Sequence, residues 1–129
     1  MPRIKKTRMK ETPGTSISPG EWGRFLDTLS ARYRGWQVQL ETYDVVTRER
    51  VLSQEMRLES IELDLEDEEN PRINVTVHDG NKVIKHILFR PSCLVSVSSG
   101  HDQKQSLLVD TVNTETTVRF RAAASSSAE

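Results

Sequence analysis

Residues 18–36 have the sequence S-P-G-E-W-G-R-F-L-D-T-L-S-A-R-Y-R-G-W, which predicts one amphipathic helix with its own start and stop. Ser18 and Glu21 have the spacing of a capping box, and Pro19 takes the first helical position, where a missing N–H costs nothing. Gly35 follows where a left-handed residue ends a helix. We therefore expect a helix over about Pro19–Arg34, with apolar residues at helical spacing on one face: Trp22, Phe25, Leu26, Leu29 and Tyr33.

After Gly35 the apolar residues alternate with polar ones, which is typical of strands with one buried face. Leu58 is out of phase with Ile61, Leu63 and Leu65, and this predicts a bulge near residues 59–60. Residues 44–54 indicate only a turn and a short irregular strand. The predicted fold class is α+β: one N-terminal helix, then a six- or seven-stranded antiparallel sheet that is strongly bent or forms a small, partly open barrel. The strands are expected over 36–40, 58–66, 73–77, 82–90, 93–97, 106–111 and 116–121.

The strand expected over Lys82–Arg90 is apolar on both faces, which favours a central position or one shared between two layers. Residues 79–81, D-G-N, supply a hairpin turn before it. If the loop has two or four residues, His86 faces the core on the same side as Val75, and we expect a hydrogen bond to hold it.

The chain has 129 residues and a formal net charge of −1, values that indicate one domain and argue against a dedicated duplex-DNA binder. We expect a disordered basic arm over 1–17, a single α+β domain over 18–121 and a disordered tail over 122–129. The single cysteine excludes an intramolecular disulfide. Without an apolar run long enough for a signal or a membrane span, the expected location is the cytoplasm, away from membranes.

No sequence pattern identifies a catalytic, cofactor or metal site. The three histidines lack zinc-site spacing, and Cys93 has the character of a small buried hydrophobe. Nucleophile-elbow, P-loop and dinucleotide-binding patterns are absent, and the acidic segment 59–69 lacks the order of a calcium loop. We assign no catalytic residue, cofactor or metal, leave enzyme activity uncertain with a preference against it, and keep an unrecognised enzyme as the last alternative.

Two resemblances to known families add to this reading. W-x-x-F-L-D at Trp22–Asp27 and R-G-W at Arg34–Trp36 resemble an uncharacterised family of small bacterial proteins, a domain of unknown function. That resemblance implies a bacterial single-domain protein and no specific activity. Separately, Lys85-His86-Ile87 resembles the lysine–histidine strand of the bacterial Sm-like RNA chaperones. The glycine of that family's second strand is missing from Leu58–Glu66, which argues against its ring assembly and uridine binding.

We therefore predict a non-catalytic interaction domain that binds an unidentified protein partner or associates with itself. The expected interaction surface comprises Lys5, Lys6, Arg8, Lys85, Cys93, Leu94, Val95 and Val97. A homodimer or larger ring would bury part of residues 83–97, because an uncharged strand without proline invites pairing. The alternative to assembly is a monomer in which the C-terminal hairpin covers that surface. The alternative function is RNA binding by a small barrel through its basic N-terminal arm.

Overall fold

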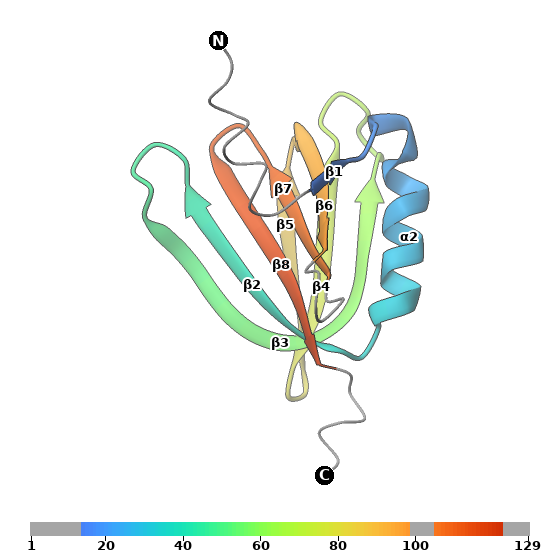
Figure 1. Ribbon diagram of the computed structural model, residues 1–129, viewed down its shortest axis with the longest axis vertical. Helices are drawn as coiled ribbons and strands as arrows, with labels where there is room; N and C mark the ends of the chain where they lie inside the picture. The colour runs from blue at the N-terminus through green and yellow to red at the C-terminus, as the bar shows by residue number, and fades with distance from the viewer. Residues whose placement is uncertain (1–13, 99–104, 123–129) are drawn as a thin grey trace.

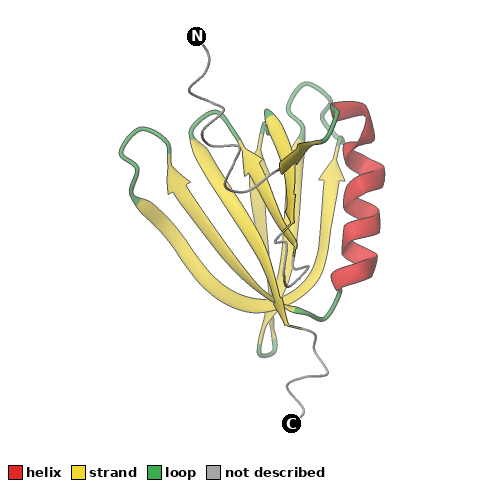
Figure 2. Ribbon diagram, viewed as in Figure 1, coloured by secondary structure: helices red, strands yellow, loops and turns green. Residues whose placement is uncertain are grey.

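The computed structural model describes residues 14–98 and 105–122, which form one helix and one eight-stranded antiparallel sheet (Figures 1 and 2). The order of strands in the sheet is β1-β6-β7-β8-β2-β3-β4-β5. The predicted fold class is thus confirmed, with one more strand than expected, β1, placed before the helix. The elements are β1 (Gly14–Ser16), the 3₁₀ turn η1 (Pro19–Glu21), α2 (Trp22–Tyr33), β2 (Gln37–Asp44), β3 (Arg50–Asp64), β4 (Arg72–Asp79), β5 (Lys82–Phe89), β6 (Cys93–Ser98), β7 (Gln105–Asp110) and β8 (Thr114–Ala122).

Strand β3 bends the sheet, because its two halves pair with different neighbours (Figure 1). Residues 50–57 pair with β2, and residues 57–64 pair with β4. The register shifts between Leu58 and Ser60, which confirms the predicted bulge. The turn expected in 44–54 lies at residues 45–47, and the strand that follows begins at Arg50 with the predicted irregularity, a register shift opposite Thr42 and Tyr43; it is long rather than short. Leu65, expected on the buried face, is 51% exposed because β3 ends at Asp64.

Helix α2 buries the expected face, although its first turn differs from the prediction. Trp22, Leu26, Leu29 and Tyr33 are buried, and Phe25 is partly buried against them. The predicted capping box is wrong, since Ser18 makes no side-chain capping bond. Its backbone carbonyl accepts the Glu21 N–H at 2.8 Å instead, because the chain enters the helix through the 3₁₀ turn η1. Gly35 has φ +88°, which confirms the left-handed stop.

The helix lies along the edge of β3 that β2 leaves uncovered (Figure 1). The Ser30 hydroxyl accepts the Ile61 N–H at 2.7 Å and donates to the Ile61 carbonyl at 2.8 Å. At the end of the helix, Gly35 N–H donates to the Leu58 carbonyl at 2.8 Å and Arg34 Nε donates to the Glu59 carbonyl at 3.1 Å. Helix α2 and its C-terminal turn therefore satisfy backbone groups that a second strand would otherwise pair.

The core fills the concave side of the bent sheet and the space under the helix. The Tyr33 ring stacks on Phe120 at a centroid distance of 4.1 Å and an interplanar angle of 11°. Fully buried strand residues come from both halves of the sheet: Val38, Leu40, Leu58, Ile61, Ile73, Val75, Val77, Leu94, Leu107, Val109, Val118 and Phe120. No helix in the described part of the chain is long and apolar enough to cross a membrane.

The segment just before the helix is part of the fold, contrary to the arm expected over 1–17. β1 pairs with β6, and the Ile17 N–H donates to the Leu94 carbonyl at 2.9 Å. The Ile17 carbonyl in turn accepts the Trp22 indole N–H at 2.8 Å. Gly14 allows this close approach, because a Cβ there would lie 2.8 Å from Val95 Cγ1. The folded region therefore begins by residue 14, and residues 1–13 and 123–129 lie outside the described residues.

Candidate functional sites

Strand β5 is the last strand of the sheet in the described structure, so one of its edges has no strand partner there. The prediction of a central or shared strand is therefore wrong. Its inner face carries Ile84, His86 and Leu88 toward the core, as expected from the two-residue turn between Asp79 and Lys82. Its outer face leaves apolar side chains in solvent, with Val83 62%, Ile87 39% and Phe89 57% exposed. An apolar outer face on an edge strand is a feature that soluble proteins usually avoid.

The free backbone groups of β5 follow from the register of the β4–β5 hairpin. Asp79 and Lys82 close a two-residue turn, and Arg90 N–H donates to the Pro71 carbonyl at 2.8 Å. Because hydrogen-bonded pairs alternate along an antiparallel ladder, the even-numbered residues from 82 to 90 bond to β4. The N–H and C=O groups of four residues consequently point away from the sheet: Val83, Lys85, Ile87 and Phe89.

The structure does not bring the predicted interaction residues together. Lys85 is exposed on β5, but Cys93, Leu94, Val95 and Val97 belong to β6, near the other end of the sheet order. β6 is paired on both sides, with β1 and β7, so it is not the open strand that the assembly hypothesis assumed. Leu94 is fully buried, and the other three are half-buried. Lys5, Lys6 and Arg8 lie outside the described residues.

Cys93 is less buried than the small buried hydrophobe that the sequence predicts. The thiol is free and half-buried, and burial followed by the nearby Asp110 carboxylate raises its pKa. A raised pKa disfavours the thiolate, which is the nucleophilic form. Cys93 is therefore a poor candidate for a nucleophile.

A cavity of about 270 Å³ opens between β5, the strands β2, β3, β4 and β8, and the turn between β7 and β8. Its lining contains no acidic or basic side chain apart from His86, and consists of Leu40, Thr42, Val51, Leu52, Val75, His86, Ile87, Leu88, Phe89, Thr111, Asn113, Thr114 and Thr116. Among the described residues, the buried Nε2 atom of His86 has no hydrogen-bond partner, so these residues do not supply the hydrogen bond expected for this core-facing histidine. Burial lowers the pKa of His86, which keeps the imidazole neutral near pH 7.

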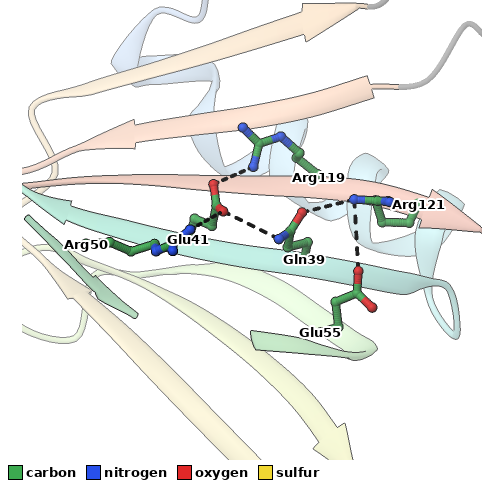
Figure 3. Close-up of polar contacts among 6 residues, drawn as sticks. All are labelled: Gln39, Glu41, Arg50, Glu55, Arg119 and Arg121. Atoms are coloured by element: carbon green, nitrogen blue, oxygen red, sulfur yellow. Dashed lines mark hydrogen bonds and ion pairs between the residues drawn. The ribbon is translucent and has the colours of Figure 1, made fainter. Parts of the chain in front are cut away.

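The outer face of β2, β3 and β8 carries an ionic cluster centred on Glu41 (Figure 3). Arg119 donates to one Glu41 carboxylate oxygen at 2.7 Å, and Arg50 to the other at 3.4 Å. Gln39 links Glu41 to Arg121, which also lies 3.9 Å from Glu55 (Figure 3). The hydrogen bond from Arg119 is the main cause of the lowered pKa of Glu41. These contacts tie β2, β3 and β8 together, and two arginines share the single carboxylate of Glu41.

Elsewhere in the described residues, a few titratable side chains form ion pairs. His78 Nε2 lies 2.8 Å from Glu59 Oε1, and Arg72 donates to Asp64 at 2.8 Å. Within residues 14–98 and 105–122, no three His, Cys, Asp or Glu side chains are grouped to hold a metal ion. His101 lies outside this part of the chain.

Sequence reasoning missed the free edge of β5 and the cavity, although one signal was present. The β5 segment holds Lys82 and Lys85 with Arg90 just beyond it and no acidic residue, a charge pattern that fits an exposed strand. Nothing local signals the Glu41–Arg119 pair, because the two residues are 78 positions apart.

The fold and these sites define a small α+β domain built on a bent antiparallel sheet that has one helix along β3 and a free edge at β5. The chain belongs to the family of unknown function DUF5335, whose model matches residues 14–128. The match includes β1, in agreement with the corrected start of the folded region. Neither the curated proteins nor the solved structures contain a match to the chain.

Proposed function

We propose that this domain is a non-catalytic protein-interaction module that binds an extended segment of a partner protein as an additional strand on β5. The observation that carries the proposal is the edge of β5, where four residues offer free backbone groups beside three exposed apolar side chains. Strand addition to a sheet edge takes affinity from backbone hydrogen bonds and specificity from alternate side chains. The outward N–H and C=O groups of β5 can supply the backbone hydrogen bonds, and its exposed apolar side chains can supply the specificity.

The charge of β5 favours an acidic partner segment over a second copy of this chain. Two β5 strands paired around a two-fold axis must match residues of the same parity, because side chains that face each other lie on one side of the sheet. Of the two registers with the longest overlap, one opposes Lys85 with Lys85, and the other opposes Lys82 with Arg90. Like charges directly opposite each other destabilise an antiparallel pair. A partner strand with carboxylates at these positions would remove that penalty.

The test compares two short peptides of strand length, rich in valine and threonine, that carry three glutamates or three lysines at matched positions. Fluorescence polarisation with labelled peptides should show saturable binding of the glutamate peptide that weakens with added salt, and at least about tenfold weaker binding of the lysine peptide. No saturable binding of either peptide, or equal binding of both, would contradict the proposal.

A matched pair of variants isolates the backbone contribution. Lys85→Pro removes one outward N–H without removing a bond to β4, which an edge strand tolerates. Lys85→Ala removes the charge and keeps the N–H. We expect Lys85→Pro to weaken binding of the glutamate peptide several-fold more than Lys85→Ala, while circular dichroism of both variants matches the unmodified chain. Equal losses in the two variants would mean that only the charge matters.

Two alternatives are outcomes of parallel measurements. A dimer found by light scattering at tens of micromolar, and lost in Lys85→Pro, would assign the edge to a second copy and overturn the choice of an acidic partner. Salt-sensitive RNA retention in a filter assay, lost when residues 1–13 are removed, would favour RNA binding through the basic arm.

We further propose a bacterial origin and a cytoplasmic location. The W-x-x-F-L-D and R-G-W resemblance supports the origin, and the free thiol of Cys93 suits a reducing compartment. Cell fractionation of the expressed full-length chain tests the location. Recovery of the chain mainly in exported fractions would contradict it.

A further inference from the structure

The free edge of β5 has a defined length, because the chain leaves the extended conformation at both of its ends. Before the strand the chain turns at Gly80, with φ +67°, and after it Arg90 has φ +54°, a left-handed value that strands do not adopt. Residues 83–89 therefore present the free edge. Their side chains on the outer face of the sheet form a row, called the outer row below: Val83, Lys85, Ile87 and Phe89.

The outer row lacks complementary neighbours on its own sheet. Side chains directly opposite each other on one face of an antiparallel pair stabilise it when they match in charge or in apolar character. Each member of the outer row lies opposite a polar residue of β4: Val83 opposite His78, Lys85 opposite Thr76, Ile87 opposite Asn74 and Phe89 opposite Arg72. Lys85 is exposed and makes no ion pair with any described side chain. Only a strand on the free side of β5 can supply the missing cross-strand neighbours.

We propose that the partner segment carries one carboxylate opposite Lys85 and apolar side chains opposite the other three members of the outer row. This register rests on the strand addition proposed above and names the residues that the edge selects. An antiparallel strand pairs slightly better per residue than a parallel one. Read from its N-terminus, an antiparallel segment then has the pattern apolar-x-apolar-x-acidic-x-apolar, with the four named side chains on one face.

Three labelled peptides of identical composition test the register. In antiparallel pairing V-T-V-T-E-T-V places its glutamate opposite Lys85, V-T-V-E-T-T-V moves the glutamate to the other face, and V-T-E-T-V-T-V reverses the order. An opposite-charge cross-strand pair changes the affinity by up to about fivefold. Fluorescence polarisation at low salt should show the first peptide binding about fivefold more tightly than the other two. Equal affinities would overturn the register, and tightest binding of the reversed order would overturn the antiparallel direction.

A charge exchange tests the contact with Lys85 itself. Lys85→Glu should reverse the preference and bind V-T-V-T-K-T-V more tightly than V-T-V-T-E-T-V. Lys82→Glu is the matched control, because Lys82 lies on the same strand but outside the outer row, and it should still prefer the glutamate peptide. Circular dichroism checks that both variants fold. A reversal in both variants, or in neither, would overturn the assignment of Lys85.

The register and the strand addition can fail separately. If all three glutamate peptides bind saturably with equal affinity, and Lys85→Pro weakens all of them, the edge accepts a strand without selecting this pattern. That result would overturn the register and leave the strand addition standing. If no peptide binds saturably, both proposals are overturned.

Discussion

Replacing Ser30 with alanine tests the claim that helix α2 acts as the missing neighbour of β3. Ser30 is 7% exposed, and its hydroxyl makes the two hydrogen bonds to Ile61 described above. In Ser30→Ala the N–H and C=O of Ile61 lose their partner inside the protein. An unsatisfied buried polar group costs about 1–3 kcal/mol, so two such groups cost about 2–6 kcal/mol. Alanine returns about 0.5 kcal/mol through its higher helix propensity.

The net expectation is a loss of about 1.5–5.5 kcal/mol in the free energy of unfolding, which lowers the urea midpoint by about 1 M or more. Thr28→Ala, at an exposed position of the same helix, is the control and should leave the midpoint unchanged or slightly raised. Ser30→Thr keeps the hydroxyl and should fall between the two. A loss below about 1 kcal/mol in Ser30→Ala, with an unchanged m-value, would refute the reasoning, because water would then be replacing the hydroxyl without penalty.

Three further outcomes are expected from urea unfolding. Leu26→Ala should cost about 2–5 kcal/mol, because Leu26 is fully buried in the helix–sheet core; a loss under half a kcal/mol would show that this face is wrongly assigned. Glu41→Gln should cost about 1–2 kcal/mol near pH 7, since it removes the charge partner of Arg119. Because the pKa of Glu41 is lowered in the folded protein, its ionised carboxylate stabilises the fold above the ordinary pKa of a carboxyl group, and this stabilisation is lost on acidification. The free energies of unfolding of Glu41→Gln and of the unmodified chain should therefore converge below about pH 4. A difference that stays constant with pH would contradict the assignment. Asp110→Asn should stabilise the fold at pH 7, because burial and then Glu115 raise the pKa of Asp110 and penalise its charged form; the gain should vanish as the pH falls below the ordinary pKa of a carboxyl group.

Local patterns in the sequence predicted the parts of the fold that local physics controls. The helix limits follow from Gly35 and from apolar spacing, and the bulge in β3 follows from Leu58 being out of phase. The capping box failed because the sequence motif does not distinguish a side-chain cap from a 3₁₀ turn at Ser18. The prediction that Leu65 is buried was wrong because the alternation of apolar and polar residues does not mark where strand pairing ends.

The candidate sites depend on pairings between distant residues, which periodicity does not encode. The β5 segment is apolar on both faces, and a pattern of that kind cannot distinguish a central strand from an edge strand. Only the order of the strands in the sheet distinguishes the two positions. In the described structure, β5 has β4 on one side and no strand on the other. In the same way, Ser30 gives no sign in the helix of its hydrogen bonds to Ile61, 31 residues away. His86 was placed correctly, but whether its imidazole has a partner depends on side chains from several strands.

The pairing of β2 with β8 has a consequence for the order in which the chain folds during synthesis. Gln37 pairs with Ala122 and Asp44 with Thr114, so one edge of β2 stays open until the last strand of the sheet has left the ribosome. The backbone pairing of β3 with β4 and of β4 with β5, and the bonds of Ser30 to Ile61, need no residue beyond 89, which allows this half to form early. The ion pair between Glu41 and Arg119 likewise cannot form until β8 has been synthesised. Nascent chains that stop before residue 114 should therefore expose a β2 edge that chaperones can recognise, and completion of β8 closes it.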